Sequence, residues 1–111
     1  MQFIATSHFR NLNDTGQNIS NGVCNIYGLF ISNTSAGTAF VQIFDLPVAS
    51  VVLGTTVPML VVVVPITTGF VNLNFWDPGL FITNRLSAFS TTTAEGLTGS
   101  ANGVFLNGIV N

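Results

Sequence analysis

The sequence predicts a single all-β domain, an antiparallel β-sandwich, and two observations lead to this fold class. Short runs of β-branched and aromatic residues alternate along the chain with clusters of Gly, Asn, Ser, Thr and Pro, as they do in sandwiches and barrels. No window repeats apolar residues with the 3.6-residue period of an amphipathic helix. The 111 residues leave room for one domain. Strand order is not readable from one chain, so a jelly roll and a simpler sandwich both stay open.

The runs place eight strands along the chain. The first, residues 2–9, precedes a polar, Asn-rich stretch at 11–21 that we interpret as a loop. Residues 1–21 are thus expected to form an N-terminal arm or first strand plus loop, and residues 22–111 the sandwich body. The other seven predicted strands span residues 22–32, 38–46, 59–65, 70–76, 80–83, 86–92 and 104–110.

Two turn sequences predict which strands pair. Asp77, Pro78 and Gly79 combine a turn-initiating side chain, a fixed φ and a permissive glycine, which predicts a hairpin between the strands on either side. Residues 33–37 separate two strong strand candidates at hairpin distance, so we expect the strands at 22–32 and 38–46 to pair antiparallel.

The chain is poor in ionised side chains. Charged residues make up 5% of the sequence, against about 25% in an ordinary soluble domain. The net charge is -2, so copies repel one another weakly and association is expected. The two basic residues could neutralise at most two phosphates, which argues against nucleic acid as a partner.

Several predicted strands carry apolar residues on both faces, although an antiparallel sandwich normally leaves one face of each sheet in water. Leaving five or six such side chains in water would forgo on the order of 10 kcal/mol of burial. We therefore expect a homo-oligomer, most simply a trimer or a lattice contact. The alternative is that loops and the N-terminal arm cover the second face within one chain. The expected interface residues are Phe3, Ile4, Tyr27, Leu29, Val41, Ile43, Val62, Val64 and Trp76.

Residues that catalysis requires are scarce. His8 is the single histidine and no Gly-x-Ser-x-Gly motif occurs, so we interpret His8 as structural or facing solvent. Cys24 is the single cysteine and is expected to pack in a strand. Asp45, Asp77 and Glu95 fall at strand ends or in loops, where turn formation is the favoured interpretation. We expect no enzymatic activity, no catalytic residue, no metal and no cofactor.

The sequence also predicts no calcium site, no membrane-spanning helix and no secretory signal. Residues 11–16 only loosely resemble an oxygen-rich calcium loop. The longest apolar run, residues 57–66, is about half the roughly 20 residues of a membrane-spanning helix, and Pro58 and Pro65 interrupt it. The first seven residues show no basic region followed by an apolar one, so no secretory signal is expected.

Four stretches of the chain resemble small β-sandwich virion proteins of tailed bacteriophages. They are residues 27–34, 39–45, 53–58 and 80–93, the last of which is an apolar strand followed by a Thr-rich run. The resemblance covers roughly residues 23 to 105 and consists of turn and strand patterns, so it implies scaffold positions and no functional residues. The matching scaffold positions are Phe30, Asn33, Phe40, Phe44, Asp45, Gly54 and Pro58.

The resemblance implies a capsid decoration, cement or head-associated role, in which small proteins brace the outer shell against the pressure of packaged DNA. The implied partners are other copies of the chain and the major capsid protein or another virion protein. The implied location is the virion, assembled in the host cytoplasm. The alternative function is an adhesive head-fibre or tail module that binds host surface glycan, with Trp76 and Tyr27 as aromatic platforms for a sugar ring. Because both residues lie within apolar strand runs, packing in the core or an interface is the favoured interpretation of these two positions.

Overall fold

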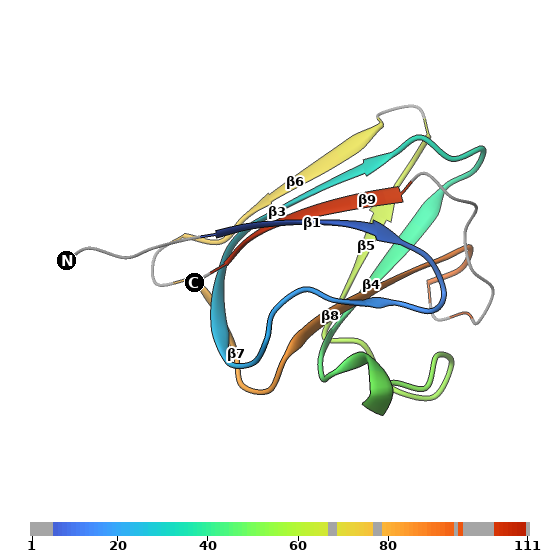
Figure 1. The fold of residues 1–111 in the computed structure, drawn as a ribbon. Helices are drawn as coiled ribbons and strands as arrows, with labels where there is room; N and C mark the ends of the chain where they lie inside the picture. The colour runs from blue at the N-terminus through green and yellow to red at the C-terminus, as the bar shows by residue number, and fades with distance from the viewer. Residues whose placement is uncertain (1–5, 67–68, 77–78, 95, 97–103, 111) are drawn as a thin grey trace.

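The computed structural model describes residues 6–66, 69–76, 79–94, 96 and 104–110, and for residues 6–10 it describes the backbone alone. These residues form two antiparallel sheets packed face to face (Figure 1), so the predicted all-β sandwich is confirmed. Sheet A has the strand order β1 (Thr6–Leu12), β9 (Val104–Val110), β3 (Cys24–Asn33) and β6 (Phe70–Asn74), and β7 (Leu80–Ile82) also pairs with β3. Sheet B has the order β2 (Gln17–Asn18), β8 (Leu86–Thr91), β4 (Ala39–Asp45) and β5 (Leu60–Val64).

The strand pairs are nested like the two arms of one long hairpin that has been rolled up. β1 pairs with β9, β2 with β8, β3 with β6 and β7, and β4 with β5, always antiparallel. Two further pairings, β3 with β9 and β4 with β8, join these pairs into the two sheets. β6 and β7 lie end to end along β3 and together occupy the place of one strand. The resulting order is that of a jelly roll.

The N-terminal region contributes a strand to each sheet. The predicted first strand at residues 2–9 overlaps β1, which continues to Leu12. The stretch predicted as a loop, residues 11–21, contains the two-residue strand β2, which pairs with Ser87 and Ala88 of β8. Polar residues suit this position because β2 lies at the edge of sheet B, where side chains can reach water.

The predicted pairing of the strands at 22–32 and 38–46 is wrong. β3 belongs to sheet A and β4 to sheet B, so the segment between them crosses from one sheet to the other. The buried side chain of Asn33 holds this crossing, because its Nδ2 donates to the carbonyls of Gly37 (2.9 Å) and Val64 (2.8 Å). Its Oδ1 accepts from the Ser35 N–H at 2.9 Å. Asn33 therefore ties β3 to β5 of the opposite sheet.

The predicted hairpin around Gly79 is also wrong. β6 pairs with residues 28–32 of β3 and β7 with residues 24–26, so both strands add to the same side of β3 and do not pair with each other. The pairing of β3 with β9 shifts register between Ile26 and Gly28, at the level where β6 gives way to β7. Asp77 and Pro78 lie outside the described residues.

The core lies between the sheets and is built from alternate residues of the facing strands. Cys24 belongs to it, which confirms its predicted packing role in a strand. Its largest aliphatic members include Leu12, Ile26, Leu29, Ile31, Val41, Ile43, Ile82, Leu86 and Leu106.

Candidate interaction surface

The outer face of sheet B is covered by the protein's own chain over β4 and β8, whereas Val63 of β5 stays 51% exposed. Phe44 and Gln42 point away from the core cluster, yet each is only 1% exposed. The Phe89 ring packs edge-on against Phe44, with 5.5 Å between ring centroids and an interplanar angle of 85°. Gln42 Nε2 donates to the carbonyl of Gly96 (3.3 Å), beyond the end of β8, and Ser87 Oγ donates to the carbonyl of Leu46 (2.6 Å). The alternative of cover from within one chain thus applies to β4 and β8, but not to the edge strand β5.

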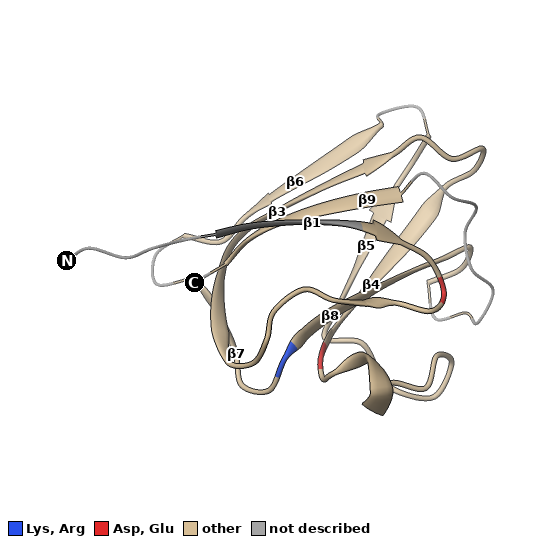
Figure 2. Ribbon diagram, in the orientation of Figure 1, with Lys and Arg blue, Asp and Glu red and all other residues tan. Residues whose placement is uncertain are grey.

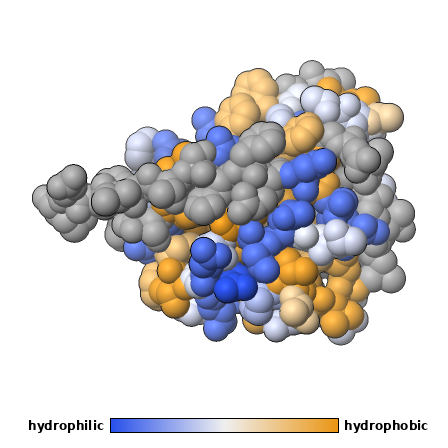
Figure 3. All heavy atoms as spheres, viewed as in Figure 1, coloured by the Kyte–Doolittle hydropathy of each residue, from blue (hydrophilic) through white to orange (hydrophobic). Residues whose placement is uncertain are grey.

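The outer face of sheet A is open and carries four exposed apolar side chains, which we call the aromatic face: Phe30 of β3, Phe70 of β6, Phe81 of β7 and Ile109 of β9. The three phenylalanines expose 45%, 55% and 58% of their surface, respectively. The rings of Phe30 and Phe70 stack, with 5.5 Å between centroids and 15° between planes. Hydrophobic side chains show along the top of the molecule in Figure 3, where β6 lies in Figure 1.

Strand register places asparagines between these apolar side chains. Phe30 lies opposite Asn72 of β6 on one side and Asn107 of β9 on the other. Next to this row, Gly28 has no side chain and leaves an open depression of about 360 Å³. The depression is lined by Tyr27, Gly28, Asn72, Leu73, Asn74 and Ile109.

The aromatic face carries no charge, because none of the residues of β3, β6, β7 and β9 is ionisable except the buried Cys24 and the half-buried Tyr27. Within the described side chains, the charged groups are Asp14, Asp45 and Arg85, and all three lie in turns or at strand ends (Figure 2). The face therefore offers a partner apolar and neutral polar groups only.

Five of the nine predicted interface residues lie in the core and not on the surface. These five are 7% exposed or less and point into the core, so the interface prediction is corrected for these positions: Leu29, Val41, Ile43, Val62 and Val64. Tyr27 is half-buried at the rim of the depression. Trp76, just after β6, is 79% exposed and lies on the surface. Phe3 and Ile4 lie outside the described residues.

Three residues that were considered for catalysis, His8, Cys24 and Asp45, all belong to strands. Asp45 is the last residue of β4, as its predicted place at a strand end requires, and it accepts hydrogen bonds from Thr83 and Asn84 of a distant segment instead of forming a turn of its own. His8 lies opposite Gly108 in the ladder between β1 and β9. Burial raises the pKa of the Cys24 thiol, while a hydrogen bond with Ser20 acts in the opposite direction. No group of His, Cys, Asp and Glu that could hold a metal occurs in the described part of the chain, and Glu95 lies outside it.

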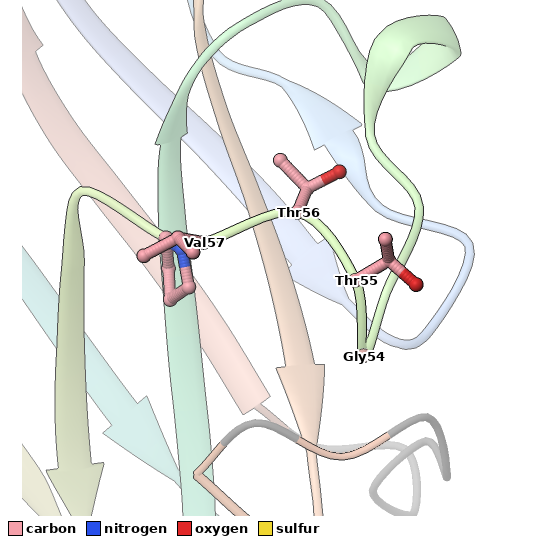
Figure 4. A pocket seen from close by; sticks show the side chains of 5 residues that line it. Gly54, Thr55, Thr56 and Val57 are labelled. Carbon is pink, nitrogen blue, oxygen red and sulfur yellow. The ribbon is translucent and has the colours of Figure 1, made fainter.

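A small hollow lies in the loop between β4 and β5, after the 3-10 helix η1 (Val48–Ser50). It has a volume of about 60 Å³ and is lined by residues 54–58 (Figure 4). The Thr56 hydroxyl is engaged nearby, since it accepts from the Val52 N–H at 2.9 Å. The residues that line it, Gly54 to Pro58, carry no charge, and no catalytic or metal-binding group is among them.

No helix among the described residues is long and apolar enough to cross a membrane. Compared with family models, curated proteins and solved structures, the chain gives no match.

Proposed function

We propose that this protein is a non-enzymatic structural protein of a tailed-bacteriophage particle, a cement or decoration protein that binds the capsid shell or another virion protein through the aromatic face. The observation that carries the proposal is the cluster of Phe30, Phe70, Phe81 and Ile109 on strands β3, β6, β7 and β9 of sheet A, which contain no charged residue. Clustered apolar side chains on a protein surface commonly mark a site of protein–protein contact. The resemblance of the sequence to small phage virion proteins suggests that the partner on this surface is the capsid shell or another virion protein.

The size of the aromatic face favours binding in many copies. An aromatic side chain contributes roughly 150–250 Å² of contact, so three half-exposed rings offer on the order of 300 Å². A stable interface needs about 800 Å² on each partner. A single copy should therefore bind weakly, and copies held in a symmetric array should bind through avidity.

Re-binding to stripped capsids tests this proposal. We expect the protein to bind and to stay bound in 1 M salt, because the contacts involve no charges. The double variant Phe30→Ser/Phe70→Ser should fold, as judged by circular dichroism, and lose binding. Val57→Ser is the matched control, since Val57 is exposed on the loop before β5, away from sheet A. Complete release of the wild type by salt, or full binding by the double variant, would contradict the proposal.

A second candidate function is an adhesive module that recognises host surface glycan. Two observations favour it: Trp76 is almost fully exposed, and the depression at Gly28 offers the amides of Asn72 and Asn74. Sugar rings stack on aromatic side chains, and their hydroxyls bond to amides. A glycan array distinguishes the candidates, because glycan binding that is lost in Trp76→Ala would favour adhesion, whereas capsid binding without glycan binding would favour the cement role.

A further inference from the structure

We infer that β5 is a pairing edge for a second copy of this chain, so that two copies of sheet B join edge to edge about a two-fold axis. This surface is separate from the aromatic face, and the inference does not depend on the proposed function. Among the described strands, β5 pairs with β4 alone and ends sheet B. An edge strand keeps a row of backbone N–H and C=O groups that another strand can bind. In β5 one of these groups, the carbonyl of Val64, already accepts from Asn33 Nδ2 at 2.8 Å, so a second strand would share it or pair with the remaining groups.

Between the flanking prolines Pro58 and Pro65, the edge lacks the features with which proteins normally block such pairing. Edge strands are usually protected by charged side chains, prolines, bulges or very short length. Residues Leu60–Val64 contain no charge and no proline, and they pair with β4 over five consecutive residues without a register shift. The opposite edge of sheet B, β2, is protected because it is only two residues long.

The sequence around β5 is complementary to itself when two copies run antiparallel. Residues 58–66, Pro-Met-Leu-Val-Val-Val-Val-Pro-Ile, are all uncharged and apolar. If the two-fold axis passes through Val62, Val61 of one copy lies opposite Val63 of the other and Leu60 lies opposite Val64. Beyond the strand, Met59 meets the proline at 65. Every contact along this edge is then apolar, and no charge opposes it.

Side-chain direction excludes odd shifts of this register, and among the even ones only the axis at Val62 pairs all five residues of β5 with the β5 of the other copy. Val62 and Val64 are buried toward the core, whereas Val63 is 51% exposed on the outer side. Pairing about Val62 places inward residues beside inward residues and outward residues beside outward residues, so the two cores and the two outer surfaces are continuous. A slip of one residue would bring the exposed row of one copy beside the buried row of the other.

The pairing closes after two copies. An isologous contact uses the same edge on both partners and leaves no second β5 edge free, so it does not propagate into a fibre. The paired strands are short, so we expect a reversible dimer. This differs from the trimer expected from the sequence, and the two are separable by mass.

Analytical ultracentrifugation over a hundredfold range of concentration is the first test. We expect the mass to rise from the 11.7 kDa of one chain to twice that value. Val63→Lys should fold and remain monomeric, because a lysine at each edge introduces like charges. Val23→Lys is the matched control, as it adds the same charge at an exposed position just before β3 of the other sheet, and it should dimerise like the wild type. A strictly monomeric wild type, a trimer, or an unaffected Val63→Lys would overturn the inference.

Cysteine cross-linking tests the register. Under mild oxidation, a mixture of Val61→Cys and Val63→Cys should form disulfide-linked dimers, because residues 61 and 63 of different copies lie opposite each other. Each variant alone should cross-link poorly, since its own two cysteines are offset by two residues and lie more than about 7 Å apart. The native Cys24 is buried and does not interfere. No cross-link in the mixture, or equal cross-linking of each variant alone, would overturn the register.

Discussion

The carboxylate of Asp45, at the end of β4, accepts hydrogen bonds from both the backbone N–H of Thr83 (2.9 Å) and its hydroxyl (2.8 Å). The N–H of Asn84 donates a third, at 2.8 Å. Asp45 thereby fixes the segment between β7 and β8 to sheet B. Burial by itself raises the pKa of Asp45, but the hydrogen bonds from this segment outweigh it, and the pKa lies below its ordinary value of 3.8.

Asp45 should make stability depend on pH. Because its folded pKa is lower than its unfolded pKa, its contribution is fully present above the unfolded value and is lost as the pH falls through the folded value. Asp45→Asn should lower the free energy of unfolding by about 1 kcal/mol at neutral pH, and this difference should shrink in acid. Urea unfolding of both proteins at several pH values measures it. The exposed Asp14→Asn is the control, and an undiminished difference in acid would contradict the prediction.

Cys24 should be unreactive in the folded protein. Its side chain is buried in the core and burial raises its pKa, so little thiolate forms and reagents cannot reach it. Ellman's reagent at mildly alkaline pH should label it slowly in buffer and rapidly in guanidinium chloride. Rapid, complete labelling of the folded protein would show that the start of β3 opens readily.

Gly16 should tolerate no side chain. Its φ is +75°, and a Cβ there would lie 2.5 Å from the ring of Phe89. Gly16→Ala should therefore lower the free energy of unfolding by about 2–4 kcal/mol, from the strained backbone and the displaced ring. Gly37→Ala is the matched control, since a Cβ at that residue would have nothing within 4 Å, and it should change stability by about 0.5 kcal/mol or less. Equal effects in thermal unfolding would argue against the placement of Phe89.

The two outer faces should respond differently to the loss of a ring. Phe44→Ala removes a fully buried side chain from beneath the loops over sheet B and should cost about 3–5 kcal/mol. Phe70→Ala removes an exposed ring from sheet A and should cost about 1 kcal/mol or less. Urea unfolding measures both values. Similar costs would mean that the faces are covered to a similar extent.

The strands could be predicted from the sequence because the pattern that marks them is local. The predicted run at 104–110 matches β9, and the others differ from the observed strands by a few residues at their ends. Strand pairing could not be predicted, because it joins distant segments. Residues 33–37 have the composition of a hairpin turn, yet they cross between sheets because Asn33 bonds to Val64 on the opposite sheet.

Five predicted interface residues lie in the core for a related reason. Where every residue of a strand is apolar, the sequence does not indicate which face points inward. The prediction took Leu29 and Val62, whereas the exposed side chains are their neighbours Phe30 and Val63. That distinction depends on which sheet covers each strand, and in sheet B it also depends on loops such as the one that contains Leu46.

The nested pairing of the strands bears on how the chain folds. The innermost pair, β4 with β5, closes only the loop at residues 46–59, whereas the outermost pair brings Thr6 beside Val110. The entropy lost on closing a loop grows with its length, so assembly is expected to proceed from the middle of the chain outward. Topologies dominated by such distant contacts reach their native state in milliseconds to seconds. On this reasoning, β1 is expected to join β9 last.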